Sequence, residues 1–424
     1  MRSPGWSSPN IRPIRRQSTP SCSTTCSGAS RPSLMRSRIE PMTVTPTNFQ
    51  DRPHSAWGFH HVRELHPTAQ VWRGVGPVWE LPQRPADLEG VAFQGAGGQP
   101  TTLAAMMAEP VHDGLIVLHR GAVVFEAYGS GMRPRDPHIL MSTTKSFAGS
   151  LAGILADQGV LDLKAEATAL APLLKGTAYD GATVRQVLDM RVGLDYVEDY
   201  SDPACDFAYM DAACGWRPPV EPGAPDNLLD HIKAIRSGPA HGGVFHYVSP
   251  TALVMGWVLE AVTGESFAEL VSRLIWQPMG AEFDGDLALD RCHRSQTEGG
   301  LNVTLRDLAR FGELHRLGGA VNGTQIVPEA WVHDIRDNGD PDAWDSGTMA
   351  DLMPGHHYRA MWYTNRSHPH RPVMTMGAFG QSVYADPVAE ITIAKLSSFP
   401  NDGDAYFGEM ARCFDAITQA LHGD

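Results

Sequence analysis

The stretch that decides the fold is Met141–Gln158, MSTTKSFAGSLAGILADQ. Its apolar side chains recur with the period of one helix face, at Phe147, Leu151, Ile154 and Leu155. Gly159 follows as a natural helix C-cap. Just upstream, two short apolar runs, Gly114–His119 and Ala122–Ala127, are separated by Arg120-Gly121, which predicts a β-hairpin. We therefore expect a strand pair followed by a buried helix.

Outward from this stretch, helices dominate the middle of the chain and strands its two ends. The patterning predicts two late strands at 381–386 and 390–397, and further helices at 183–190, 251–263, 266–276, 305–317 and 405–421. This order favours an α/β fold in which a sheet domain is built from both ends of the chain. We expect residues 42–139 and 286–424 to form that sheet domain. Residues 140–285 are expected to form an inserted, mainly helical domain, with the active site at the junction.

The charge of the 424-residue chain is unevenly distributed. The net charge is −14, but residues 1–41 hold seven arginines and one glutamate, a charge of +6, so residues 42–424 carry −20. An acidic body argues against nucleic acid as a partner. No stretch approaches the ~18–20 consecutive apolar residues of a membrane span, which excludes an integral membrane protein.

The N-terminal segment differs from the rest in composition. Residues 1–41 contain ten serines and six prolines and show no apolar periodicity, so we expect them to stay outside the fold. The segment is either a disordered, transit-like tail or a mis-assigned start, with Met42 as the true first residue. The six cysteines form no CxxC pair, which favours a reducing, cytoplasmic location. The 18 histidines lack metal-site spacing, so no metal and no cofactor are predicted.

Ser142-Thr143-Thr144-Lys145 is an S-x-x-K motif at the start of the predicted helix. A serine at a helix N-terminus lies among free backbone N–H groups and the positive end of the helix dipole. A lysine one turn further on lies on the same face and can reach the serine hydroxyl. This spacing predicts an activated nucleophile. The alternative is a capping serine with a lysine at the surface.

Further blocks in the same order give the chain a family resemblance. It resembles the penicillin-recognising serine hydrolases and class C β-lactamases in Ser142–Lys145, Val187–Leu194, Tyr247–Ser249, Trp257–Gly264, Ile275–Gly280, Gly299–Phe311 and Gly377–Gln381. Within that superfamily it is most similar to the nylon-oligomer (6-aminohexanoate-dimer) hydrolase branch, in Ala182–Tyr200, Gly299–Gly319, Gln325–Trp331 and Gly377–Ser398.

The resemblance implies a β-lactamase/transpeptidase-like fold, with an antiparallel sheet flanked by helices, and a covalent mechanism. Ser142 would be the nucleophile, and Tyr247 with Lys145 the base. Because a phenol is a weak acid, a tyrosine base needs a nearby cation, which the lysine would supply. The backbone N–H groups of Ser142 and Ala378 would form the oxyanion hole.

The resemblance also indicates substrate contacts. Tyr200 would close over the substrate and Asp211 would contact an amine, and the other implied contacts are Ser249, Phe379, Gly380 and Gln381. Residues 192–216 hold six acids and no lysine or arginine, so this segment is either a solvated loop or a wall that attracts a cation. The family's Lys-Thr-Gly position reads Ala378-Phe379-Gly380, and the missing cation disfavours β-lactam substrates.

We therefore predict a serine hydrolase that cleaves a small amide or ester. The alternatives are a carboxylesterase, or a D-amino-acid amidase or β-lactamase of the same superfamily. A non-catalytic penicillin-binding-like sensor is an alternative of another class. The expected partner is a small-molecule substrate, without nucleic acid or membrane, and a homodimer stays open.

Overall fold

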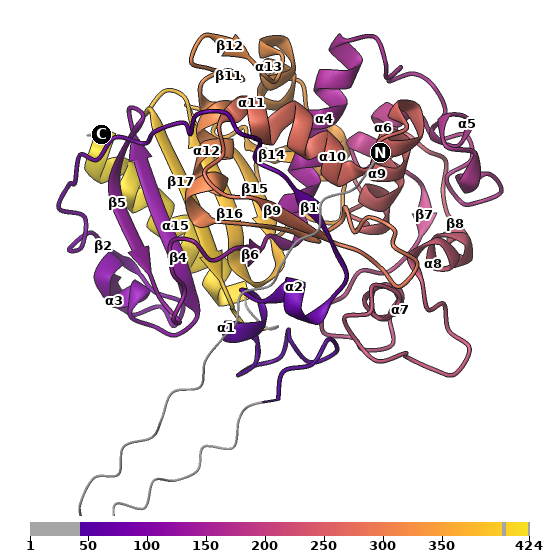
Figure 1. Cartoon of the computed structure of the whole chain (residues 1–424), viewed down its shortest axis with the longest axis horizontal. Coiled ribbons are helices and arrows are strands. Elements are labelled where there is room, and N and C mark those ends of the chain that lie inside the picture. Colours follow the sequence, from indigo (N-terminus) through magenta and orange to yellow (C-terminus); the bar gives the residue numbers. More distant parts are fainter. Residues whose placement is uncertain (1–42, 401–403, 423–424) are drawn as a thin grey trace, which may run out of the picture. The chain divides into compact units, whose positions relative to one another are not determined.

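A seven-stranded antiparallel sheet is the largest element of the protein (Figure 1). The computed structural model describes residues 43–400 and 404–422. In spatial order the strands are β13 (His356–Arg359), β14 (Trp362–Asn365), β15 (Val373–Gly377), β16 (Gln381–Asp386), β17 (Ile391–Ser397), β4 (His112–His119) and β5 (Ala122–Tyr128). The hairpin predicted at 114–127 is confirmed. Because β4 pairs with β17, the sheet is assembled from both ends of the chain, as expected.

The sheet is covered on both faces, and the alternation of side chains along its strands explains why. On β4, Leu115 and Val117 pack toward a cluster that includes residues of helices α3 (Leu103–Met107) and α15 (Asp404–His422). Ile116 and Leu118 belong to the larger core on the other side, which includes α12 (Leu305–Arg316). Successive strand residues point to opposite faces, so a strand between two helical layers is apolar throughout.

A second sheet leads the chain into the S-x-x-K motif. It has four antiparallel strands in the order β1 (Thr68–Val71), β9 (Gly285–Ala288), β10 (Leu301–Val303) and β6 (His138–Ile139). After β6 the chain makes a short 3₁₀ turn, η1 (Met141–Thr143), and enters α4 (Thr144–Asp157). The helix predicted at 141–158 is therefore confirmed, with its first three residues in the 3₁₀ turn. Helix α4 is buried along most of its length.

Most of the elements between β6 and β13 are helices. The remaining helices are α1 (Ser55–Gly58), α2 (Val62–Leu65), α5 (Ala167–Leu170), η2 (Pro172–Leu174), α6 (Val184–Leu188), α7 (Asp206–Ala213), α8 (Leu228–Ala234), α9 (Pro250–Thr263), α10 (Phe267–Val271), η3 (Ser272–Trp276), α11 (Gln277–Met279), α13 (Glu329–Asp337), α14 (Pro341–Asp345) and η4 (Ala378–Gly380). Two hairpins, β2 (Ala92–Gln94) with β3 (Pro100–Thr102) and β11 (Ala320–Val321) with β12 (Thr324–Gln325), complete the fold. A further two-stranded sheet pairs β7 (Leu194–Asp195) with β8 (Arg236–Ser237), which are separated in the chain by α7 and α8.

The predicted fold class is confirmed, with two local differences. The helix expected at 183–190 is shorter, at Val184–Leu188, and the one expected at 266–276 changes from α-helix to a π-helical segment at Ser272–Trp276. From residue 43 onward the chain is one compact unit, and the proposed boundaries of sheet and helical domains stay a prediction. Residues 1–41, predicted to lie outside the fold, are outside the described residues. Within the described ranges, no helix has the length and apolar character needed to cross a membrane.

Candidate active site

The predicted nucleophile lies on a strained turn. Ser142 is the middle residue of η1, and the preceding Met141 is a buried non-glycine residue with a φ of 47°. A left-handed conformation costs such a residue about 1–3 kcal/mol and persists only where the surroundings impose it. Thr143 shows one such constraint, because its Oγ1 lies 3.0 Å from Oγ1 of Thr375 on β15. The turn is therefore clamped between α4 and the large sheet.

Lys145 is the most constrained charged group at this turn. Its side chain is 1% exposed, and Nζ donates to Ser142 Oγ (2.7 Å), Ser249 Oγ (3.1 Å) and the Glu298 carbonyl (2.7 Å). An ammonium has three N–H donors, and all three are used. The alternative of a surface lysine is therefore wrong. The predicted serine–lysine pair is brought together, and the lysine has a fixed direction toward the serine oxygen.

Glu198 belongs to the site, although in the sequence it stood out only as one of the six acids of residues 192–216. Its Oε1 accepts hydrogen bonds from Ser249 Oγ and Tyr200 Oη, both at 2.7 Å, and its Oε2 accepts from the Ser249 backbone N–H at 2.6 Å. Burial raises the pKa of Glu198, while the nearby charge of Lys145 opposes that rise. Glu198 therefore connects the buried lysine, through Ser249, with the tyrosine predicted to cover the substrate.

Tyr247, the predicted base, has its ring beside the lysine. The Lys145 Nζ is 5.3 Å from the centroid of the Tyr247 ring, and the Tyr247 backbone N–H donates to Thr348 Oγ1 at 3.1 Å. Tyr247 and Ser142 line the same cavity. Tyr363 lies next to Tyr247, and burial raises the pKa of Tyr363 well above its usual value. Serine, lysine and Tyr247 thus form one cluster.

The segment after β15 brings a second backbone turn to the nucleophile. Gly377 ends β15, and a Cβ there would lie 2.5 Å from the Leu140 carbonyl oxygen, so only glycine allows this close approach. Ala378 and Phe379 follow on η4, and Phe379 has a φ of 63°. Both line the cavities beside Ser142. Ala378 therefore lies at the same cavities as Ser142, and its oxyanion role stays a prediction.

Two predicted substrate contacts are corrected. Gln381 is fully buried, and its Nε2 donates to the carbonyls of Ala378 (3.1 Å) and Ser397 (2.8 Å) while its Oε1 accepts from the Ser397 N–H (3.0 Å). Gly380 is buried with a φ of 91°, and a Cβ there would lie 2.3 Å from the Phe399 ring. Neither residue lines a cavity beside Ser142. Both instead hold the turn that presents Ala378.

Two cavities meet at Ser142. The first has a volume of about 510 Å³ and includes the predicted contacts Asp211 and Ser249. The second has a volume of about 480 Å³ and includes Tyr247. Four residues border both cavities: Ser142, Tyr200, Ala378 and Phe379. A substrate with its carbonyl at Ser142 can therefore extend one half into each cavity.

The first cavity has an acidic end. Asp211 is 7% exposed, its Oδ2 lies 3.7 Å from Arg217 Nε, and burial raises its pKa to about 7. Glu298, which the sequence analysis missed, also lines this cavity, and burial raises its pKa to about 7. The Cys214 thiol donates to Glu298 Oε1 at 3.2 Å, whereas Oε2 is buried without a hydrogen-bond partner among the described residues. Two buried acids, Asp211 and Glu298, therefore border this cavity.

The second cavity has a different character. Apolar side chains form much of its wall, among them Met349, Leu352, Met376 and Phe407. Its titratable members are Glu198, His246 and four tyrosines, and no lysine or arginine of the described chain lines it. This cavity is therefore suited to an uncharged group.

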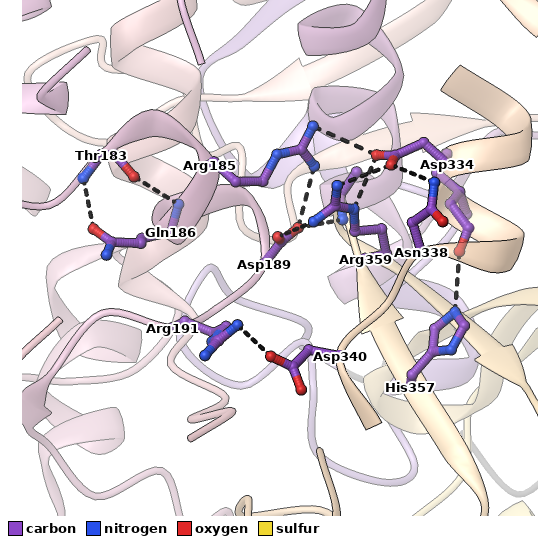
Figure 2. A network of polar contacts seen from close by, with 12 residues as sticks. Thr183, Arg185, Gln186, Asp189, Arg191, Asp334, Asn338, Asp340, His357 and Arg359 are labelled. Carbon is purple, nitrogen blue, oxygen red and sulfur yellow. Dashed lines mark hydrogen bonds and ion pairs between the residues drawn. The ribbon is translucent and has the colours of Figure 1, made fainter. Parts of the chain in front are cut away.

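An ion-pair network supports the segment that leads into Tyr247 (Figure 2). The Asp189 carboxylate accepts from Arg359 Nη1 at 2.7 Å, and Arg359 also pairs with Asp334 at 2.8 Å. The next residue, Met190, accepts a backbone hydrogen bond from His246 at 2.9 Å. Asp189 and Met190 therefore link the segment immediately before Tyr247 to β13, the edge strand of the large sheet.

Fold and site together define a serine hydrolase built on an antiparallel sheet with helices on both faces. The family model described as Beta-lactamase matches residues 92–410, and the chain belongs to the beta-lactamase family. Among curated relatives, it is 34% identical over 382 residues to the 6-aminohexanoate-dimer hydrolase of Paenarthrobacter ureafaciens, covering 88% of this chain and 95% of that protein.

Solved structures agree with this assignment. A Bacillus anthracis structure named for 6-aminohexanoate-dimer hydrolase superposes with a TM-score of 0.81 and 27% identity, covering 89% of this chain and 97% of that one. EstCE1, described as a hydrolase with promiscuous acyltransferase activity, has a TM-score of 0.56 and 19% identity, covering 74% and 94% of the two chains. The second likeness shows the fold alone.

Proposed function

We propose that this protein hydrolyses a small amide or ester through an acyl-enzyme on Ser142. The observation that carries the proposal is the buried Lys145 ammonium, which donates to Ser142 Oγ at 2.7 Å. A cation held there stabilises the serine oxygen as it loses its proton. Burying a charged lysine costs free energy, and the three hydrogen bonds of Lys145 offset that cost. A buried cation kept next to Ser142 Oγ in this way supports a catalytic role.

The proposed reaction has two steps. Ser142 Oγ attacks the substrate carbonyl while Tyr247, with Lys145 beside it, takes the hydroxyl proton. The backbone N–H groups of Ser142 and Ala378 hold the oxyanion. Collapse breaks the bond to the amine or alcohol, which leaves with the proton. Water then attacks the acyl-enzyme, the same base takes a water proton, and the free acid and Ser142 hydroxyl are regenerated.

We infer a substrate whose acyl half ends in an ammonium. Asp211 and Glu298 both border the first cavity, and a cation near them would be attracted to both carboxylates. The name of the relative from Paenarthrobacter ureafaciens points to an aminohexanoyl group, which carries such an ammonium. The leaving half would then occupy the apolar second cavity.

A carboxylesterase is the second candidate. The apolar wall at Met349, Leu352 and Met376 fits a neutral alcohol as well as an amine. A β-lactamase or D-amino-acid amidase is less well supported, since Ala378-Phe379-Gly380 offers no cation for a carboxylate. The non-catalytic sensor is disfavoured because the serine, lysine and tyrosine are all present and clustered.

The test combines labelling with a substrate panel. A fluorophosphonate probe should give a single adduct, located on Ser142 by peptide mass spectrometry. The panel contains 6-aminohexanoate dimer, p-nitrophenyl esters, D-amino-acid amides and nitrocefin. Turnover of the dimer above the esters, relative to their uncatalysed rates, supports the amidase, and the reverse supports the esterase. Failure of Ser142 to label, together with no turnover of any substrate, would favour the sensor.

A further inference from the structure

Three buried side chains from separate parts of the chain converge outside the active site. His60 lies between α1 and α2, Asp113 is on β4 of the large sheet, and His138 is on β6 of the second sheet. His60 is 7% exposed, and the other two are fully buried. One ligand-type atom of each residue lies within 4.8 Å of those of the other two. Neither active-site cavity includes any of the three.

The hydrogen bonds of His138 define which of its nitrogens is free. Nδ1 lies 2.7 Å from the Ile139 carbonyl oxygen, which can only accept, so Nδ1 carries a hydrogen. Nε2 lies 3.2 Å from Asp113 Oδ2. Nε2 and this carboxylate oxygen therefore need either a proton or a metal cation between them. A histidine that binds a metal through one ring nitrogen commonly donates its other ring N–H to a backbone carbonyl, as Nδ1 of His138 does here.

The other two members each add an independent observation. The Nε2 atom of His60 is buried and has no hydrogen-bond partner among the described residues, and its ring centroid lies 5.1 Å from that of His138. The second carboxylate oxygen of Asp113, Oδ1, accepts from Ser398 Oγ at 3.3 Å, which orients the carboxylate. An unsatisfied imidazole nitrogen in the interior needs a partner, and a bound cation supplies one.

We propose that His60, Asp113 and His138 bind one divalent transition-metal ion, with Zn²⁺ as the best fit. Two nitrogens and one carboxylate oxygen form a common zinc ligand set, completed by water. Ligands about 2.0–2.1 Å from a tetrahedral ion lie about 3.3 Å apart. The separation of His138 Nε2 and Asp113 Oδ2, 3.2 Å, matches that spacing. His60 would complete the set with a small movement of its ring.

The ion would have a structural role. It would join the N-terminal segment at His60 to both sheets, and β6 leads within four residues to Ser142. Phe59, the neighbour of His60, packs against Phe379 with ring centroids 5.1 Å apart. The metal would thus stabilise the turns on both sides of the nucleophile without taking part in the reaction. This proposal revises the sequence-based expectation of no metal.

The experiment uses the full chain, stripped with a chelator and then given Zn²⁺. We expect one equivalent of zinc per chain by elemental analysis after gel filtration. Zinc at about 100 times its Kd should raise the Tm by about 3–5 °C. His60→Gln should lose both effects. Two controls should keep them: His61→Gln beside the site, and His370→Gln in the other histidine–carboxylate cluster, formed by His368, His370 and Asp386.

A spectroscopic measurement keeps the proposal falsifiable if His60→Gln does not fold. Co²⁺ added to the stripped wild-type chain should give the visible d–d bands of a four- or five-coordinate ion, and zinc X-ray absorption should show two imidazoles. Absence of stoichiometric zinc from the wild type would overturn the proposal in favour of a direct hydrogen bond between His138 and Asp113. Zinc binding that survives in His60→Gln but is lost in His370→Gln would also overturn it.

Discussion

At the scale of single residues, the Ser249 hydroxyl determines how the charges of the site are connected. It accepts from Lys145 Nζ and therefore donates its one hydrogen to Glu198 Oε1. Glu198 Oε1 also accepts a hydrogen bond from Tyr200, the residue predicted to close over the substrate. The glutamate therefore holds Tyr200 and, through Ser249, Lys145 in one arrangement. We therefore regard Glu198 as a positioning residue.

Replacing Glu198 with glutamine tests that role. Glu198→Gln keeps the shape of the side chain but removes the charge and one acceptor oxygen. Hydrogen bonds to charged groups contribute about 1.5–3 kcal/mol, so kcat/KM should fall about 10–100-fold. The pH profile should also change, because the Glu198 carboxyl, whose pKa burial raises, no longer titrates in the variant. Glu80→Gln, the same change at an exposed residue that borders neither cavity, is the control. A variant within twofold of wild type at every pH would show that Glu198 has no positioning role.

Removing the Ser142 hydroxyl gives the most direct prediction. Ser142→Ala deletes one oxygen from the turn, so the Tm should change by only a few degrees. Turnover should fall by at least about 10³-fold, since the nucleophile is lost. Ser237→Ala, on the exposed strand β8, should behave as wild type. Steady-state kinetics after a labelling check would decide, and retention of more than a few per cent of the rate would remove Ser142 from the mechanism.

The sequence revealed Ser142 and Lys145 because one helical turn separates them, a spacing that is visible in the chain itself. Glu198 and Glu298 were not predictable in this way. Their partners lie 51 and 84 residues away, at Ser249 and Cys214, and only the fold brings these pairs together. Gln381 shows the opposite limit. Its position in a family motif suggested a substrate contact, whereas burial and three backbone hydrogen bonds give it a structural role.

At the scale of elements, periodicity predicted where helices and strands lie, but not how they are joined. The π-helical segment Ser272–Trp276 has the same apolar pattern as an α-helix, so the sequence could not distinguish them. The ion-pair network in Figure 2 is a second case. It connects α6 with α13 and β13 through Asp189, Asp334 and Arg359, which are far apart in the chain.

That network gives a prediction about stability. Asp189→Asn leaves Arg359 and Arg185 facing one carboxylate instead of two. Breaking a buried ion pair costs about 3–5 kcal/mol, and the partly exposed arginines reduce this to about 2–4 kcal/mol. Denaturant unfolding should show the loss, while Asp342→Asn, at an exposed position of α14, should show none. A change below about 0.5 kcal/mol in Asp189→Asn would mean that the network contributes little to the fold.

At the scale of the whole molecule, charge is distributed in a way that bears on substrate choice. Residues 42–424 carry a net charge of −20, and the first cavity has a carboxyl-lined end. Surface charges contribute only about 0.2–1 kcal/mol each and are screened beyond about 8–10 Å. The two buried carboxyls at Asp211 and Glu298 should therefore matter more than the rest of the surface.

The two carboxyls should make the preference for a substrate with a terminal ammonium depend on pH. Burial raises the pKa of both Asp211 and Glu298 to about 7, so each is mostly neutral at pH 6 and mostly ionised at pH 8. A substrate with a terminal ammonium stays charged over this range. Its kcat/KM relative to an N-succinylated counterpart should therefore rise with pH, reaching at least about tenfold at pH 8.

Variants and salt separate the contributions to that preference. Asp211→Asn and Glu298→Gln should each flatten its rise between pH 6 and 8, because each removes one of the ionising carboxyls. High salt should reduce the part due to the exposed surface and leave most of the part due to the cavity, since buried charges are screened less. The ratio is best measured with paired p-nitrophenyl esters, whose common leaving group cancels chemical differences at the carbonyl. Faster turnover of the succinylated ester at pH 8 would refute the electrostatic assignment of the first cavity, while leaving the role of Ser142 intact.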